Sequence, residues 1–347
     1  MNGGERLKKI FWAVFSPMIA VLTVWAVLKQ NENVSPSVIL ETAKSADKLL
    51  LASACICAFM FVWFEGAAVR TIAKSAGYKR SCASGLIYAA SDVYFSAITP
   101  SATGGQPASA YFMVKDGIPT GVSAAVLVLN LMMYTVSVVV LGVIAVVTDP
   151  HAFSAFSSPS KLLIVCGAVV LTMLSTAFLI LLVKGKYVFA LPRRLVGAMK
   201  LSRLTEKIDR AEKDYSSCAV MLAKDRPLLL RAFIWNFLQR ASQIVVPMVL
   251  YLALGGEGRY AGTMFSRQCL ITIGYNFVPI PGAMGVADYL MIDGFSGVVG
   301  SDAAFSLEML SRGLTFYICV TLSGVITLTG YIAKRKAKYE NAEEKDK

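Results

Sequence analysis

Long runs of apolar residues alternate with short polar segments along most of the chain. Six of these runs reach about 20 residues, the length that an α-helix needs to cross roughly 30 Å of hydrocarbon. The six predicted transmembrane helices cover residues 10–28, 49–69, 121–148, 162–183, 228–254 and 314–332. The first run follows basic residues, as a signal peptide would, but no small-residue cleavage site follows it. We therefore predict a retained helix there.

Two further apolar regions are interrupted by proline and glycine. Residues 81–98 lead into "TPSATGGQPASA", and "YFMVKDGI" leads out; later, residues 263–280 and 282–299 meet at "PIPGAMG". Non-helical backbone at membrane depth is tolerated only where it is buried in protein or lines a watery cavity. We predict a re-entrant pair of short helices at each break, one pair in each half of the chain, which is typical of an internal repeat. Ordinary interhelical loops are the alternative.

The distribution of lysine and arginine predicts the orientation. Basic residues gather before the first span, at 70–80, between the two halves and after Ile332, whereas 148–161 and 255–262 carry one basic residue each. By the positive-inside rule both termini lie in the cytoplasm, and the first re-entrant pair opens from that side. The net charge of +12 follows mostly from this topology, so we do not predict nucleic-acid binding.

Composition agrees with an all-α integral membrane protein. Hydrophobic residues make up 56% of the chain and the mean hydropathy is +0.61, too apolar for an ordinary soluble fold. The single histidine argues against histidine-rich metal sites and a Ser-His-Asp hydrolase. No Walker loop is present, which argues against ATP-driven pumping. We predict no catalytic residue, metal or cofactor.

The segment between the halves has a different pattern. From Leu201 to Leu222, apolar residues recur at spacings of three and four with charged residues between them, which predicts an amphipathic helix. It packs on its own bundle or lies on the anionic inner leaflet. The predicted organisation is one membrane domain over 1–335, with a cytoplasmic segment at about 184–227 between its halves, and a disordered tail at 336–347.

The two breaks also carry a family resemblance. "ITPSATGGQPASAYFMVKDGI" and "NFVPIPGAMGVADYLMI" resemble the lysylphosphatidylglycerol synthetase transmembrane region, also called the flippase-like domain family, over about residues 8–335. The second motif departs from the family pattern, with Ala283 for a glycine and Asp288 for a glutamate. Larger members carry a soluble domain that transfers lysine from lysyl-tRNA to phosphatidylglycerol. The chain stops fifteen residues after Ile332, so we expect that domain to be absent.

The resemblance implies a lipid flippase of a bacterial plasma membrane. Its substrate would be an anionic or aminoacylated phospholipid such as lysylphosphatidylglycerol, and a separate soluble aminoacyltransferase is an expected partner. A phosphatidylglycerol lysyltransferase, or its membrane subunit, is an alternative that would use lysyl-tRNA and contribute to resistance against cationic peptides. A non-transporting membrane scaffold is the third possibility.

A headgroup that crosses the membrane needs polar partners there. The glycines of the first break precede a half-helix whose N-terminus suits a phosphate, although the same residues could only cap a buried turn. Arg240 or Arg267 is the candidate phosphate ligand, and Asp92 or Asp288 the candidate for a cationic headgroup or a coupling proton; structural pairing among them is the alternative. The candidate lipid-binding residues are Asp92, Thr103, Gly104, Gly105, Gln106, Arg240, Arg267, Pro281, Gly282, Gly285 and Asp288.

Overall fold

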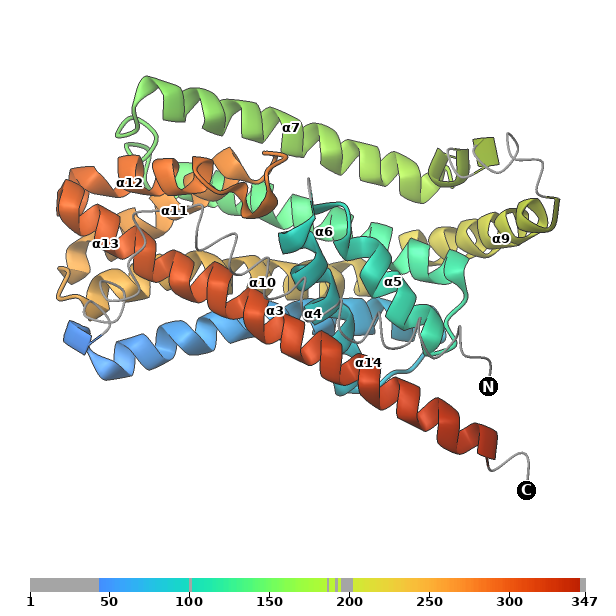
Figure 1. Ribbon diagram of the computed structural model, residues 1–347. Coiled ribbons are helices and arrows are strands. Elements are labelled where there is room, and N and C mark those ends of the chain that lie inside the picture. The colour runs from blue at the N-terminus through green and yellow to red at the C-terminus, as the bar shows by residue number, and fades with distance from the viewer. Residues whose placement is uncertain (1–43, 100–101, 186, 191–192, 195–201, 344–347) are drawn as a thin grey trace.

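The computed structural model describes residues 44–99, 102–185, 187–190, 193–194 and 202–343, and within these ranges it is helical with no β-strand (Figure 1). The prediction of an all-α fold is confirmed for this part of the chain. The predicted span at residues 10–28 lies outside the described residues, as do residues 344–347 of the predicted tail.

Four helical segments of the described chain are long and apolar enough to cross a membrane. They are α3 (Lys48–Ser75), α6 (Thr120–Thr148), α7 (Ser158–Val183) and the continuous segment Ser301–Arg335. The last comprises α13 (Ser301–Arg312), the π-helical turn η4 (Gly313–Ile318) and the first part of α14 (Cys319–Glu343). These segments contain four of the six predicted spans, so the chain is a multi-pass membrane protein.

The predicted span at 228–254 forms α10 (Arg226–Ala253) but is not among those four segments. Its middle carries Asn236, Gln239, Arg240 and Gln243, which make it too polar. α10 packs extensively against α3 in an antiparallel arrangement. The Asp47 amide donates to the Ala253 carbonyl at one end of this pair (2.8 Å), and Gln239 bonds Glu65 further along. A polar stripe is therefore held against an apolar helix inside the bundle.

Each predicted break connects two short helices. The first hairpin is α4 (Cys82–Ile98) and α5 (Gly105–Lys115); the second is α11 (Ala261–Tyr275), preceded by η2 (Gly258–Tyr260), and α12 (Val286–Val299), with the turn η3 (Pro281–Ala283) between them. Hydrogen bonds from Gln106 to Asp92 and from Tyr88 to Asp116 show that α4 and α5 are antiparallel. α4 also contacts η3, so the break of the second hairpin lies against the first hairpin.

The amphipathic segment forms α9 (Ser202–Lys224), which extends from one end of the bundle (Figure 1). Its apolar face packs against α6 and α7. The Tyr215 hydroxyl donates to the Leu181 carbonyl at 2.9 Å, and Tyr215, Cys218 and Leu222 are buried. Of the two predicted placements for this helix, the structure shows packing on its own bundle.

Candidate functional site

A polar cluster lies in the middle of the bundle, where α3, α4, α5 and α10 meet. Glu65 of α3 is 6% exposed and accepts a hydrogen bond from Nε2 of Gln239 at 2.9 Å. Asp92 of α4 accepts one from Nε2 of Gln106 at 2.9 Å. Glu65 and Asp92 also lie close enough to interact electrostatically with each other.

Arg240 of α10 completes this central cluster. It is only 7% exposed, and its guanidinium carbon lies 4.1 Å from the ring centre of Tyr134 and 4.8 Å from that of Phe61. Its Nη1 donates to Gln243 at 2.8 Å, while its Nε has no hydrogen-bond partner. Among the described residues, Arg240 has no carboxylate within ion-pairing distance, although it interacts electrostatically with the acidic pair. A buried guanidinium is therefore held by rings and an amide instead of by a direct ion pair.

Glycine at the start of α5 allows the first hairpin to close on this cluster. A Cβ at Gly105 would lie 2.0 Å from both Oδ1 of Asp92 and Oγ of Ser96. The Gly104 amide donates to Oγ1 of Thr99 at 2.9 Å, and Thr103 beside it is exposed. The turn thus makes its described contacts within the hairpin, and an anion-binding role for the N-terminus of α5 stays a prediction.

The second hairpin holds a separate ionic group. Asp288 accepts from the Gly285 amide at 2.9 Å and lies 2.9 Å from Nε of Arg312 on α13. Arg312 also donates to the Gly282 carbonyl at 3.0 Å. Gly282 has φ +61°, and a Cβ there would meet the Phe316 ring at 2.4 Å. The second break is therefore tied to α13 and η4 by Arg312; the side chain of Pro281 lies outside the described part of the chain.

Arg267 does not join the central cluster. Its Nη1 donates to the Gly294 carbonyl at 2.6 Å and so links α11 to α12. It interacts electrostatically with Asp149, at the C-terminal end of α6. Of the two arginines proposed from the sequence, only Arg240 lies with Asp92, and Asp288 has its own partner in Arg312.

Sequence reasoning missed Glu65, Gln239 and Arg312. Glu65 stands alone in the apolar run "FMFVWFEGAAV", and an isolated acid inside a predicted membrane helix is itself a signal for a functional residue. Gln239 and Arg312 carried no comparable signal, because their importance depends on which distant helix they contact.

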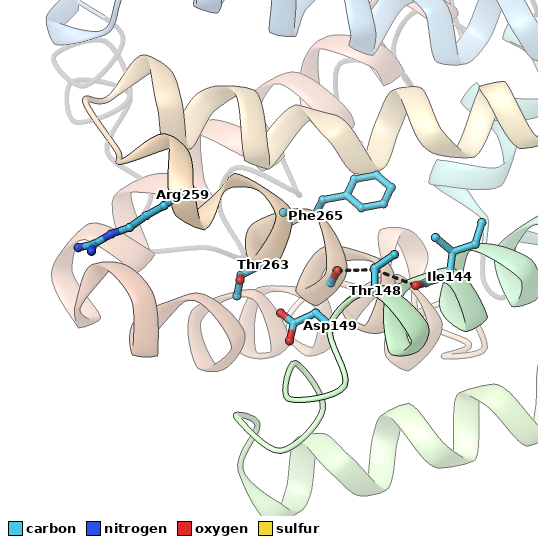
Figure 2. A pocket seen from close by; sticks show the side chains of 8 residues that line it. Ile144, Thr148, Asp149, Arg259, Thr263 and Phe265 are labelled. Carbon is cyan, nitrogen blue, oxygen red and sulfur yellow. Dashed lines mark hydrogen bonds between the residues drawn. The ribbon is translucent and has the colours of Figure 1, made fainter.

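The structure also has a pocket of about 400 Å³ between the C-terminal end of α6 and the start of α11 (Figure 2). Its lining includes Ile144, Thr148, Asp149, Arg259, Thr263 and Ser266. Thr148 and Ser266 join the two helices through their hydroxyl oxygens, 3.3 Å apart. No residue of this pocket was a sequence-based candidate.

The fold and its polar centre define a multi-pass helical membrane protein. The family described as "Lysylphosphatidylglycerol synthase TM region" matches residues 12–323, and the chain belongs to this family. It is similar to a UPF0104 membrane protein of Archaeoglobus fulgidus, with 21% identity over 309 residues that cover 84% of this chain and 90% of that protein. No solved structure matches it significantly. The resemblance predicted from the two breaks is confirmed.

Proposed function

We propose that this protein moves a phospholipid headgroup across a bacterial plasma membrane along a path that passes the central cluster. The observation that carries the proposal is Arg240, a buried guanidinium with no direct ion pair among the described residues. An arginine near the middle of a membrane is costly, by about 2.5–3.5 kcal/mol on insertion scales. A buried charge with an unfilled donor is a suitable ligand for a passing anion.

The chemistry of the cluster suits a headgroup. The planar guanidinium of Arg240 matches a phosphate better than a lysine would, because it offers several donors in a fixed geometry. Glu65 and Asp92 lie on the neighbouring helices α3 and α4, where they would accept an ammonium group or exchange a proton. An anionic or aminoacylated phospholipid, such as lysylphosphatidylglycerol, fits both halves of the cluster.

The proposed topology places one hairpin on each side of the membrane. The two hairpins are re-entrant, the first from the cytoplasm and the second from the outside, as the distribution of basic residues predicts. Support comes from the contact of α4 with η3, since a break that packs against the other hairpin is the arrangement expected of broken helices around a transport site. In this topology both termini and α9 face the cytoplasm, and a soluble aminoacyltransferase could supply the lipid there.

The proposal is tested by lipid translocation in vesicles. Purified protein is reconstituted with fluorescent phosphatidylglycerol, phosphatidylethanolamine or lysylphosphatidylglycerol, and outer-leaflet label is quenched with dithionite. We expect protein-containing vesicles to move at least one of these lipids several times faster than protein-free vesicles. Translocation is excluded if none of the three lipids moves faster in protein-containing vesicles than in protein-free vesicles. A parallel incubation with labelled lysyl-tRNA and phosphatidylglycerol tests the lysyltransferase alternative, for which we expect no transfer of lysine.

A further inference from the structure

The pocket at the end of α6 has the mixed lining of a site for an amphiphilic molecule. Its volume of about 400 Å³ lies in the range of small-molecule sites. Ile144 and Phe265 line it with apolar surface, whereas Thr148, Thr263 and Ser266 add hydroxyl groups (Figure 2). Because Gly121 at the other end of α6 packs against α9, this pocket lies at the end of α6 remote from α9.

Two polar groups of the pocket make no hydrogen bond to the described part of the protein. In the described part of the chain, neither the carboxylate of Asp149 nor the hydroxyl of Thr263 has a hydrogen bond. Thr148, by contrast, donates to the Ile144 carbonyl at 2.8 Å. Arg267 attracts Asp149 electrostatically, but its Nη1 donates to a backbone carbonyl on α12. A half-exposed carboxylate that lines a pocket and has no protein donor can accept a hydrogen bond from a ligand.

The pocket has apolar surface on one side and a charged side chain on another. On α6, the side chains of Val143, Ile144 and Val147 are exposed, and exposed apolar residues on a membrane-crossing helix face lipid chains. Arg259 also lines the pocket, and its side chain extends away from Asp149 (Figure 2). In the described part of the chain its carboxylate partner is Glu257, at 2.6 Å, and both side chains are exposed to solvent. Such an exposed pair contributes little and is easily exchanged for a phosphate.

We infer that this pocket binds an amine-bearing phospholipid headgroup. The ammonium group donates to Asp149, Thr263 hydrogen-bonds to the headgroup, the phosphate lies toward Arg259, and the acyl chains follow the apolar face of α6. This inference rests on the proposed function for the role of the pocket in transport, where it is a headgroup site at the end of the path remote from α9. Binding itself does not depend on transport.

The test is equilibrium binding of short-chain lipids to the purified full chain, measured by calorimetry with dihexanoyl phosphatidylethanolamine and dihexanoyl phosphatidylglycerol. The ethanolamine lipid carries an ammonium group and the glycerol lipid does not. We expect Asp149→Asn to weaken binding of the ethanolamine lipid about tenfold, the usual value of one charge-assisted contact, and binding of the glycerol lipid less than about twofold. Thr263→Val should weaken the ethanolamine lipid by a smaller factor.

Asp302→Asn is the matched control, because Asp302 is an exposed acid at the start of α13 that does not line the pocket. The inference is overturned if wild-type protein does not bind the ethanolamine lipid, if Asp149→Asn weakens both lipids equally or neither, or if Asp302→Asn has the same effect. A protein that binds through Asp149 but moves no lipid refutes only the proposed function. One that moves lipid but binds independently of Asp149 refutes only this inference.

Discussion

Nε2 of Gln239 donates a 2.9 Å hydrogen bond to Oε2 of Glu65, and this bond joins the two most extensively packed helices at the polar centre of the bundle. Gln239→Leu would leave a buried carboxyl group without this donor. We expect the free energy of unfolding to fall by about 1–3 kcal/mol, measured by denaturation in detergent micelles. Ser242→Ala, which removes a bond only to the carbonyl of its own helix, should cost less than about 1 kcal/mol. Equal losses in both variants would show that the α3–α10 bond has no special importance.

Gly105 is expected to tolerate no side chain. Gly105→Ala places a methyl group 2.0 Å from Oδ1 of Asp92, so the hairpin must open or Asp92 must turn away. Overpacking of this kind costs about 1–3 kcal/mol, and it should reduce lipid translocation together with stability. Gly258→Ala is the control, because nothing lies within 4 Å of its added carbon. Wild-type stability and translocation for Gly105→Ala would contradict the close packing of α5 on α4.

An ion pair fastens the first hairpin to the last helix. Asp116, which follows α5, pairs with Lys334 of α14 and also accepts from the Tyr88 hydroxyl. The two charged side chains are only 14% and 16% exposed. A double-mutant cycle with Asp116→Asn and Lys334→Gln should give a coupling energy of about 1–3 kcal/mol. The pair of Arg259 and Glu257, at 67% and 62% exposed, should give less than about 1 kcal/mol; similar couplings would refute a structural role for the buried pair.

Thiol labelling tests the docking of α9. Burial raises the pKa of the Cys218 thiol from 9.0 to about 11, so at pH 8 its thiolate fraction falls roughly a hundredfold. Because the thiolate is the reactive form, labelling rises with pH up to the raised pKa. In single-cysteine variants, maleimide should label Cys218 at pH 8 at least tenfold more slowly than the exposed Cys82. Comparable rates would mean that α9 does not pack against α6.

Apolar run length predicted the spans well where few polar residues interrupt the apolar run. α3, α6 and α7 contain predicted spans, because apolar side chains occupy nearly every turn of these helices. α10 is different, since its polar middle is stabilised by Glu65 and by aromatic rings on other helices. The sequence also predicts the breaks at Gly105 and Gly282, because proline and glycine interrupt the apolar runs there. Their re-entrant placement stays a prediction.

The candidate site was predicted only in part. Asp92, Gln106 and Arg240 do lie in one cluster, whereas Asp288 bonds to Arg312. The sequence gives charges and their depth along a helix but not which helices meet. Pairs such as Asp92 with Glu65 depend on contacts between segments far apart in the chain, which no periodicity encodes.

The most direct test of the central claim is the translocation rate of Arg240→Gln in vesicles. The matched control is Arg231→Gln, which removes an exposed arginine from the same helix. Both proteins are first shown to fold by their denaturation midpoints, and Arg240→Lys is included to keep the charge without the planar donor geometry. If Arg240 contacts the phosphate during crossing, Arg240→Gln should slow translocation at least tenfold, Arg240→Lys should be intermediate, and Arg231→Gln should match wild type. A folded Arg240→Gln protein that moves lipid at the wild-type rate would contradict the account.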